Sequence, residues 1–411
     1  MKKSENVTPY LLGGDLNAYS VARAFFEAEG VRSRAFMRYK TGITSHVGFL
    51  SVTVNGELCR PEVLKGALLD CAKSSVGERP LLIPCADWYT EALQKLRREL
   101  SERFRLFLPP KDAWELLKDK ASFYSLISKY KIPYPESVVF TSSELDKISA
   151  SKIPYPAVLK PSDSTEYWAH PFDGMRKVYF PKNESDALEI ARLIFASGYG
   201  GRLILQRYVG KGAEELEVLT VYLDRRGEPV RAALAEVLLE ERGPTAMGNY
   251  AALITRPLTP IAFSLIKMLR DIGYTGIANF DIIKDGEQSF VLECNTRQGR
   301  SSDYLLACGI NIAALMLADM REERITPSFD YPEIYWHSAP QESVASHATD
   351  KELLKRALFL RSKGLEYTPF DNTRRYKNSP VRRAYLWLHK ARQIAMFDRC
   401  SKNETGGESE K

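Results

Sequence analysis

The chain has 411 residues, of which 44% are hydrophobic and 27% charged, and its net charge is +6. These values are typical of a soluble globular protein with two or three domains. No apolar run approaches the length that spans a bilayer, and the N-terminus lacks the long apolar segment and cleavage site of a signal peptide. The six cysteines have no CxxC spacing, which argues against structural zinc and a disulfide framework and favours a cytoplasmic protein.

The N-terminal segment 7–30 has the pattern of a strand, a glycine turn and a helix. The strand ends at Leu12, Gly13-Gly14-Asp15 forms the turn, and Gly30 stops the helix. A glycine turn before a helix can bind an anion, but this one lacks the spacing of G-x-G-x-x-G, so a structural turn is favoured over a cofactor site. Further alternation of strands and helices predicts an α/β domain to about residue 105.

A second unit begins after Pro110. Its pattern predicts a helix over 113–131, a strand at 137–141 and another strand that ends with Lys160. A lysine at a strand end usually reaches solvent, but with carboxylates nearby it also suits a nucleotide phosphate. The polar segment 162–166 is expected to be a flexible loop that could cover phosphates as a lid.

The pattern of the segment 276–302 predicts a β-hairpin, and we expect the rest of the chain to be organised around it. Two apolar runs, 277–283 and 290–294, flank an Asp-Gly turn. Strict alternation along the second strand puts Val291, Glu293 and Asn295 on one face and Phe290, Leu292 and Cys294 on the other.

Asp281, Glu293 and Asn295 are the oxygen-bearing side chains of this hairpin. Two carboxylates and a carboxamide suit Mg²⁺, which completes its coordination with water and phosphate oxygens. Arg297 and Arg300 follow and could bind anionic oxygens. The alternative is an ordinary hairpin whose acidic residues are solvated.

The remaining elements predict an antiparallel set of strands and a basic C-terminal region. Strands are expected at 218–223, 232–239 and 249–256, and an apolar helix over 304–316 is interrupted by Gly309. After an amphipathic helix at 350–364 the chain turns basic, with Arg374, Arg375, Lys377, Arg382, Arg383, Lys390, Arg392 and Arg399.

This basic region permits several interpretations. A helix packed on the body with a solvated basic face is favoured, with electrostatic capture of an anionic acceptor as a secondary role. Weak peripheral association with an anionic membrane is an alternative, although the apolar positions form no single clean stripe. Nucleic acid binding is the least favoured.

Several blocks of the chain resemble the ATP-grasp ligases, and more narrowly the D-aspartate ligases that build the side-chain bridge of some bacterial peptidoglycans. The blocks are LLGGDLNAYSVARAFFEAEG, SFYSLISKYKIPYP, LKPSDSTEYW, GNYAALITR, GYTGIANFDIIKDG and LECNTRQGRSS. The resemblance implies an α/β chain with an ATP-grasp fold. It implies an N-terminal α/β substrate domain at 1–108, an ATP-grasp domain at 109–326 with subdomains 109–205 and 206–326, and a basic helical extension at 327–411 with a disordered tail.

The resemblance also implies residue roles. Lys120 and Lys160 would contact ATP phosphates, with Lys160 also catalytic. The residues beside adenine and ribose would be Gln206, Arg207, Tyr208, Val209 and Glu214 or Glu215. Asp281, Glu293 and Asn295 would bind Mg²⁺, with Asn295 also beside the nucleotide. Arg297 and Arg300 would be catalytic, and the substrates would contact Gly14, Asp15, Asn249, Arg297, Arg300 and Ser301.

Two of these positions depart from the family pattern. The segment that would cover the phosphates is rich in Ser, Asp and Thr, whereas many ATP-grasp relatives have glycines there. Gln206 stands where many relatives have an acidic residue.

The implied reaction is amide formation that depends on ATP and Mg²⁺. A carboxylate, D-aspartate by resemblance, becomes an acyl phosphate, and an amine, the lysine side chain of a nucleotide-linked peptidoglycan precursor, attacks it. One alternative is an ATP-grasp ligase with another amino acid or amine, and a second is a non-catalytic nucleotide-binding protein. The oligomeric state, monomer or dimer, is left open.

Overall fold

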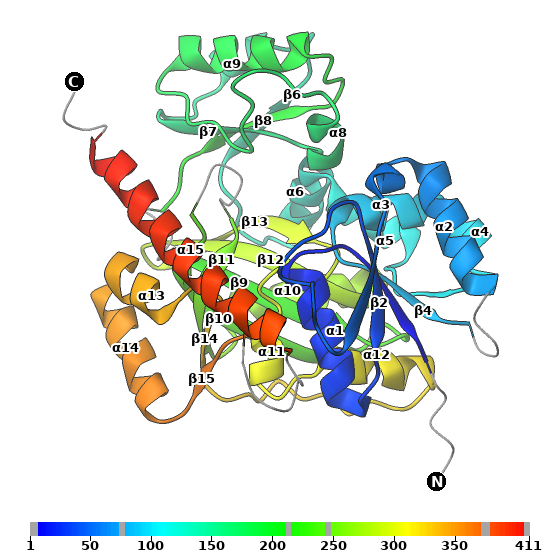
Figure 1. The fold of residues 1–411 in the computed structure, drawn as a ribbon. Coiled ribbons are helices and arrows are strands. Elements are labelled where there is room, and N and C mark those ends of the chain that lie inside the picture. The colour runs from blue at the N-terminus through cyan, green and yellow to red at the C-terminus, as the bar shows by residue number, and fades with distance from the viewer. Residues whose placement is uncertain (1–6, 74–78, 211–214, 243–247, 371–378, 407–411) are drawn as a thin grey trace.

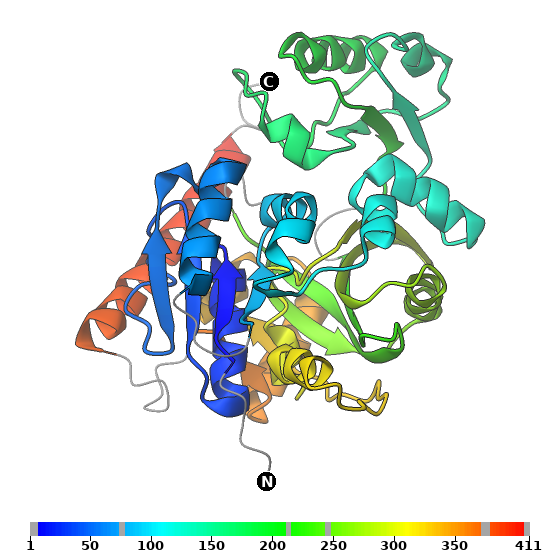
Figure 2. The ribbon, with the colours of Figure 1, turned by 90° about the vertical axis from the view of Figure 1, so that its right-hand side faces the viewer.

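The computed structural model describes residues 7–73, 79–210, 215–242, 248–370 and 379–406, with side chains described as far as residue 400. In these residues the helices and strands are organised around three sheets. A small upper lobe stands above a larger body (Figure 1), and a view from the side separates the two clearly (Figure 2).

The N-terminal sheet has five parallel strands in the order β3-β2-β1-β4-β5. Its strands are β1 (Pro9–Leu12), β2 (Ser33–Met37), β3 (Leu50–Val54), β4 (Leu81–Pro84) and β5 (Arg105–Leu106). Its helical segments are α1 (Leu16–Glu29), η1 (Gly56–Cys59), α2 (Pro61–Lys73), α3 (Asp87–Lys95) and α4 (Arg97–Leu100). The expected strand, turn and helix are confirmed, since Asp15 caps α1 and Gly30, with φ of 69°, ends it.

The upper lobe contains the three-stranded antiparallel sheet β6-β8-β7. Its elements are β6 (Ser137–Phe140), α7 (Asp146–Ala150), β7 (Ala157–Pro161), α8 (Ser164–Trp168), α9 (Glu184–Ala196) and β8 (Leu203–Arg207). Apolar residues of α9 pack on this sheet, including Ala187 and Ile194 against Leu159 and Leu205. The lobe therefore has a core of its own.

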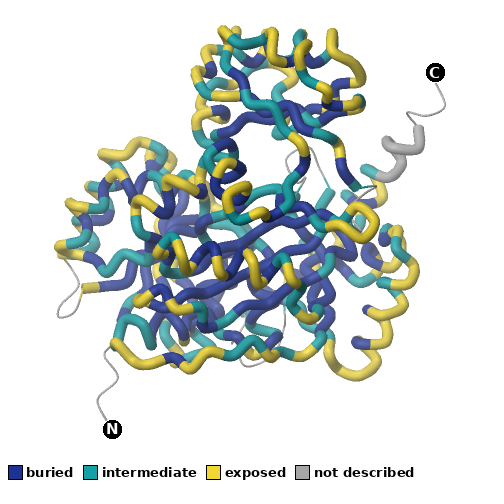
Figure 3. Tube along the Cα trace, turned by 180° about the vertical axis from the view of Figure 1, so that it is seen from behind, coloured by how far each residue is buried: buried dark blue, intermediate teal, exposed yellow. Residues whose placement is uncertain are grey.

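The largest sheet has the order β13-β12-β9-β10-β11-β14-β15 and is antiparallel except for its last pair. Its strands are β9 (Leu216–Leu223), β10 (Pro229–Glu240), β11 (Tyr250–Arg256), β12 (Gly276–Asp285), β13 (Gln288–Asn295), β14 (Tyr335–His337) and β15 (Glu366–Tyr367). Its four long strands β9 to β12 are buried along most of their length (Figure 3). The expected antiparallel set and hairpin are thus confirmed.

Helices cover both faces of this sheet. One face packs on α5 (Lys111–Lys118), α6 (Lys120–Lys129) and α10 (Pro260–Asp271). The other packs on α1, α11 (Tyr304–Ala307) and α12 (Ile312–Met320), which join it to the N-terminal sheet in one apolar core. The N-terminal sheet and the large sheet are therefore joined through buried apolar side chains.

Two expectations about local structure are wrong. The helix expected over 113–131 is broken, because Asp119 leaves the helical conformation and caps α6 through Ser122 N. The loop expected at 162–166 contains the start of α8, because Asp163 caps the N–H groups of Thr165 and Glu166. The expected interruption of the helix over 304–316 is confirmed, since Gly309, with φ of 79°, lies between α11 and α12.

The C-terminal region contains α13 (Gln341–His347), α14 (Lys351–Ser362) and the long helix α15 (Pro380–Gly406), which crosses the front of the body (Figure 1). Leu386 and Phe397 are buried, and the Phe397 ring stacks on His347. Arg382 is also buried and donates to the carbonyl oxygens of Gly42 and Ser45. The packed helix favoured from the sequence is therefore what the structure contains; Arg374, Arg375 and Lys377 lie outside the described residues.

Phe397→Ala tests this packing. The substitution should lower the free energy of unfolding by about 3 kcal/mol, because it removes a large buried side chain and leaves a cavity. Arg399→Ala, two residues along and exposed, should change it by less than about 0.5 kcal/mol. Urea denaturation of both variants measures the difference, and an equal effect of the two substitutions would contradict the packing.

Candidate active site

The β12–β13 hairpin contains a bulge that decides which side chains face the site. Asp281 pairs with Glu293, but Ile282 pairs with Val291, so Leu292 is the extra residue. Val291 and Cys294 consequently pack in the core, while Leu292 and Glu293 both line a cavity. The strict alternation expected along this strand is therefore wrong, since Glu293 does not share a face with Val291.

That cavity has a volume of about 300 Å³ and lies between the upper lobe and the large sheet. Three lysines and three carboxylates line it: Lys120, Lys160, Lys177, Glu240, Asp281 and Glu293. Part of its wall is apolar, from Val209, Leu216, Ile283 and Leu292, which pack together. A cavity with an apolar wall and opposed charges can hold a flat ring and a charged group side by side.

Lys120 is at the first position of α6 and forms an ion pair with Glu293, at 3.0 Å between Nζ and Oε2. Its Nζ also lies 3.4 Å from Ser164 Oγ, on the first residue of α8. The segment expected to act as a lid therefore has one side chain at the cavity, supplied by the start of a helix.

Lys160 is buried at the end of β7, as expected, but its contacts are with neutral groups. Its Nζ donates to Gln206 Oε1 at 2.9 Å and to Tyr124 OH at 3.1 Å. Burial, followed by the charges of Lys120 and Lys177, lowers the pKa of Lys160 to about 7. Gln206 is thus occupied in positioning the ammonium group, a role that the sequence did not indicate.

Asp281 and Glu293 have opposite environments although they are cross-strand partners. Asp281 accepts a hydrogen bond from Tyr250 OH at 2.8 Å, and burial together with Glu293 raises its pKa to about 8. Glu293 has its pKa lowered, chiefly by the Lys120 ammonium. Asn295 Nδ2 lies 3.5 Å from Asp281 Oδ2, so the three predicted metal ligands lie together.

These three side chains fit Mg²⁺ by the chemistry of their donors. Two carboxylates and one amide oxygen are a partial set of hard ligands, which leaves positions for water and phosphate oxygens. The part of the chain that the structure describes contains no group of three or more His, Cys, Asp or Glu residues arranged for a metal ion. An all-protein cage, as a structural zinc site would need, is therefore not formed by these residues.

Arg297 and Arg300 lie beyond the hairpin and are bound by carboxylates of the protein itself. Arg297 donates to both oxygens of Asp87, from Nε at 2.7 Å and Nη2 at 2.6 Å. Arg300 donates to Glu241 from Nε at 3.2 Å and Nη2 at 3.1 Å, and its Nη1 lies 3.4 Å from Asp15. The two arginines are therefore next to the carboxyl ends of β1 and β4, where the parallel sheet places its loops.

The other predicted residues divide between the two regions. Arg207, Tyr208 and Val209 line the cavity with Gln206. Gly14 and Ser301 belong to the arginine region, since Gly14 precedes Asp15 and Ser301 is buried beside Arg300. Asn249 accepts from the Glu241 amide at 2.8 Å, at the edge between the regions.

Of the two residues predicted for the ribose hydroxyls, the structure describes only Glu215, which does not line the cavity. Glu215 is half-buried outside the cavity lining, and Glu214 lies outside the described residues. Their assignment to the ribose stays a prediction.

Two polar residues that line the cavity, Glu240 and Tyr250, were not predicted, and neither was Tyr124, whose hydroxyl accepts a hydrogen bond from Lys160. Tyr250 is on β11, which is separated from β12 by two strands, so the sheet must curl for its hydroxyl to reach Asp281. Glu240 accepts from the Gly248 amide at 3.0 Å, and burial raises its pKa. The only signal in the sequence for Glu240 and Tyr250 was that each is a polar residue at the end of a strongly apolar strand.

The comparisons with known proteins agree with this geometry. No protein-family model matches the chain. The biotin carboxylase domain of Hydrogenobacter thermophilus 2-oxoglutarate carboxylase, solved with MgADP and bicarbonate, matches with a TM-score of 0.60 at 19% identity, over 79% of this chain and 73% of that one. An ADP complex of N5-carboxyaminoimidazole ribonucleotide synthetase matches with a TM-score of 0.60 at 14% identity, over 87% and 86%. The fold is therefore that of the ATP-grasp enzymes, as expected from the sequence.

A closer relationship comes from sequence. D-aspartate ligase of Enterococcus faecium (strain Aus0004) is 31% identical over 326 residues, which cover 77% of each chain. The large chain of carbamoyl phosphate synthase of Rubrobacter xylanophilus is 26% identical over 56% of this chain but only 21% of its own length. The chain belongs to the D-aspartate ligase family and is an ATP-dependent ligase, which confirms the resemblance seen in its motifs.

The stability of the protein should depend on pH through Lys160. The folded pKa of Lys160 is below its unfolded value, so between about pH 7 and pH 10 the unfolded chain binds more protons and stability rises with pH. Lys160→Met removes this dependence. Urea denaturation between about pH 6 and pH 9 should show that the free energy of unfolding of the wild type rises relative to that of Lys160→Met. The same comparison with Lys152→Met, a substitution of an exposed lysine, should show no change with pH.

Proposed function

We propose that this protein uses ATP and Mg²⁺ to join D-aspartate to the lysine side chain of a nucleotide-linked peptidoglycan precursor. Membership of the D-aspartate ligase family supports the ligase class, and a relative named D-aspartate ligase, at 31% identity, supports the substrates. The observation that carries the proposal is the convergence of Lys120, Lys160, Asp281 and Glu293 on one cavity of about 300 Å³.

The cavity is the proposed nucleotide site. The apolar wall of Val209, Leu216, Ile283 and Leu292 would receive adenine, next to Gln206 to Val209. The ammonium groups of Lys120 and Lys160 would contact the phosphates. Phosphate would also raise the pKa of Lys160 from about 7 and keep this lysine charged in the complex.

Asp281, Glu293 and Asn295 would hold Mg²⁺ at the end of the hairpin. Bound there, the ion would neutralise charge that develops on the phosphoryl group in transfer. Lys120 is the present partner of Glu293, and it is close enough to turn from that carboxylate to a phosphate. Tyr250 fixes one oxygen of Asp281 and leaves the other directed towards Asn295.

Arg297 and Arg300 would bind the carboxylate substrate between the nucleotide site and the N-terminal sheet. The carboxylate oxygen attacks the terminal phosphorus of ATP, which gives an acyl phosphate and ADP. The amine then attacks the acyl carbon, and inorganic phosphate leaves as the amide forms. The protein supplies orientation and charge in this scheme, and no side-chain nucleophile is needed.

The cell compartment is also a proposal. No helix in the described part of the chain is both long and apolar enough to cross a bilayer. A cytoplasmic location is proposed because ATP and the nucleotide-linked precursor are found there and because the cysteines form no disulfide framework.

Glu293→Gln tests the metal site. The substitution keeps the shape of the side chain but removes the charge opposite Lys120 and the metal, so the ligation rate should fall by about 100-fold or more. Glu287→Gln, in the exposed turn of the same hairpin, should retain full activity. Steady-state assays of ADP formation at several Mg²⁺ concentrations give the comparison. Normal turnover of Glu293→Gln at low Mg²⁺ would rule out the assignment.

Product analysis tests the substrates. With ATP, Mg²⁺, D-aspartate and a nucleotide-linked pentapeptide containing lysine, mass spectrometry should detect a product equal to both substrates minus one water, with one ADP formed per coupling. L-aspartate, other amino acids and acceptors without lysine serve as controls. Preferential coupling of another amino acid would replace D-aspartate in the proposal, and ATP hydrolysis without coupling would refute ligation to this acceptor.

A further inference from the structure

The long helix α15 has a buried side that accounts for its position. Arg382, Leu386 and Phe397 are buried along it, and Lys390 reaches Glu342 of α13 at 2.7 Å. The Tyr385 ring lies against Gly42, where a Cβ would be 2.0 Å from the ring. This side alone holds the helix to the body, so the opposite side is not needed for packing.

The opposite side of α15 carries a row of exposed apolar residues in addition to the expected solvated charges. Its outer ridge consists of positions that share one helical face at spacings of three, four or seven: Val381, Ala384, Leu388, Ala391 and Ala395. All five are exposed, and Trp387 beside them is 70% exposed. A surface helix that is apolar on its outer side as well as its inner side exposes area that solvent does not favour.

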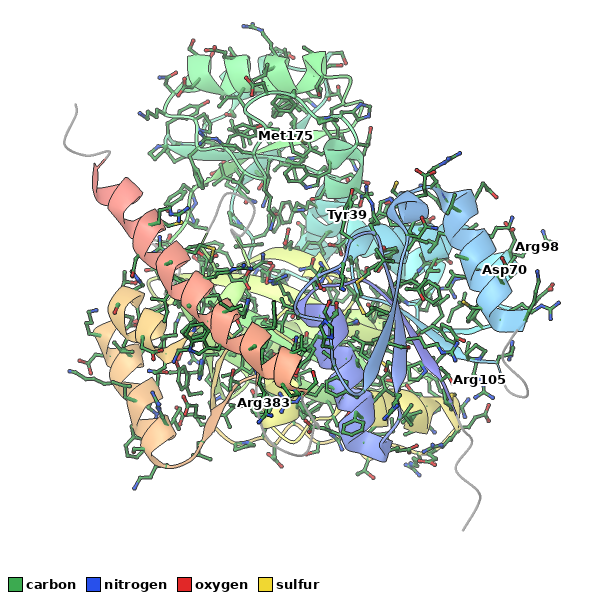
Figure 4. All side chains as sticks on the ribbon, viewed as in Figure 1. Tyr39, Asp70, Arg98, Arg105, Met175 and Arg383 are labelled. Carbon is green, nitrogen blue, oxygen red and sulfur yellow. The ribbon has the colours of Figure 1, made fainter. Side chains whose placement is uncertain are left out.

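Cations flank this outer ridge on both sides. Arg383 lies on one side of it and Arg392 and Arg399 lie close to the other, and all three are exposed, whereas Lys390 is paired with Glu342. Arg383 is at the lower end of the helix in Figure 4. The exposed acid in the same stretch, Asp398, is engaged by His347 at 3.2 Å. The surface is therefore apolar along its centre and positive at its margins.

This combination selects one class of occupant. A second copy of the chain placed face to face would bring the same arginines against each other, and like charges oppose such an interface. An anionic lipid surface matches both features, since acyl chains accept the apolar centre and headgroups accept the flanking cations. Tryptophan is enriched at the depth where these two regions meet.

The position of α15 allows such contact. The helix lies at the outer edge of the molecule in the side view of Figure 2, with no other element outside it. From Val381 to Ala395 the outer ridge is about 21 Å long at 1.5 Å per residue. No described helix could cross a bilayer, so the contact would be with one leaflet.

We propose that the outer ridge of α15 docks the protein on an anionic membrane surface, with Trp387 and Leu388 inserted at the boundary between headgroups and acyl chains. As expected from the sequence, the apolar positions of α15 do not form one stripe, because they divide into a buried set and the outer ridge. The inference is independent of the proposed substrates and of catalytic activity.

Vesicle binding of the full chain tests the proposal. Cosedimentation should show binding to phosphatidylcholine vesicles that contain about one third phosphatidylglycerol, little binding to pure phosphatidylcholine, and several-fold weaker binding when salt rises from about 50 to 500 mM. Trp387→Ser combined with Leu388→Ser should weaken binding about tenfold or more. Arg383→Ser combined with Arg392→Ser should weaken it and reduce its dependence on salt.

A matched control and two further outcomes complete the experiment. Phe263→Ser combined with Leu193→Ser removes an exposed aromatic residue of α10 and an exposed leucine of α9 and should leave binding unchanged. The proposal would be overturned if the Phe263 and Leu193 control lost as much vesicle binding as the Trp387 and Leu388 double variant. It would also be overturned if the wild type did not bind. A wild-type dimer by light scattering that the Trp387 and Leu388 substitutions convert to monomer would assign the ridge to a second copy instead. Thermal melts of all variants check that they fold.

Discussion

The ion pair between Lys120 and Glu293 is the contact on which the candidate site depends. It joins the start of α6 to the hairpin of the large sheet, and both side chains are largely shielded from solvent. A buried charge that loses its partner is strongly destabilising, so this pair constrains α6, the hairpin and the α8 segment together. The cavity between them is lined by four basic residues, Lys120, Lys160, Lys177 and Arg207, and by three acidic ones, Glu240, Asp281 and Glu293. The site is consequently assembled by its own opposed charges, and the same groups suit phosphates and a divalent cation.

The sequence predicted which helices and strands form this site better than it predicted which way their side chains point. The hairpin, the strand ending at Lys160 and the turn at residues 13–15 follow from local patterns, because turn residues and alternation act within a few residues. The bulge at Leu292 could not be predicted, since it depends on the register with the neighbouring strand. One extra residue there moves Glu293 away from the face of Val291, and the chemistry of the cavity follows from that shift.

The other features that the sequence did not predict depend on contacts between segments that are distant in the chain. Tyr250 reaches Asp281 only because the sheet curls, and Gln206 meets Lys160 because β8 lies directly beside β7. The outer ridge of α15 was obscured for a related reason. The sequence shows apolar and basic residues interleaved, and only the packing of Leu386 and Phe397 reveals which apolar residues remain outside. Patterns within one element cannot supply this information, because it is fixed by which surface the element packs against.

The arginines after the hairpin add a constraint between the N-terminal sheet and the site. Arg297 is bound in a bidentate manner by Asp87, which is 54% exposed, so that carboxylate can return to water with little penalty. A substrate carboxylate could replace Asp87 at the Arg297 guanidinium. One anion would then take the place of another, and the guanidinium would not have to be transferred from water as an unpaired charge. Arg300 is different, because Glu241 is largely buried and shares the arginine with Asp15. An anion at Arg300 would therefore face two carboxylates, of which the buried one is harder to displace. The geometry thus favours Arg297 as the arginine that exchanges partners and Arg300 as the one that holds the Asp15 turn to the hairpin.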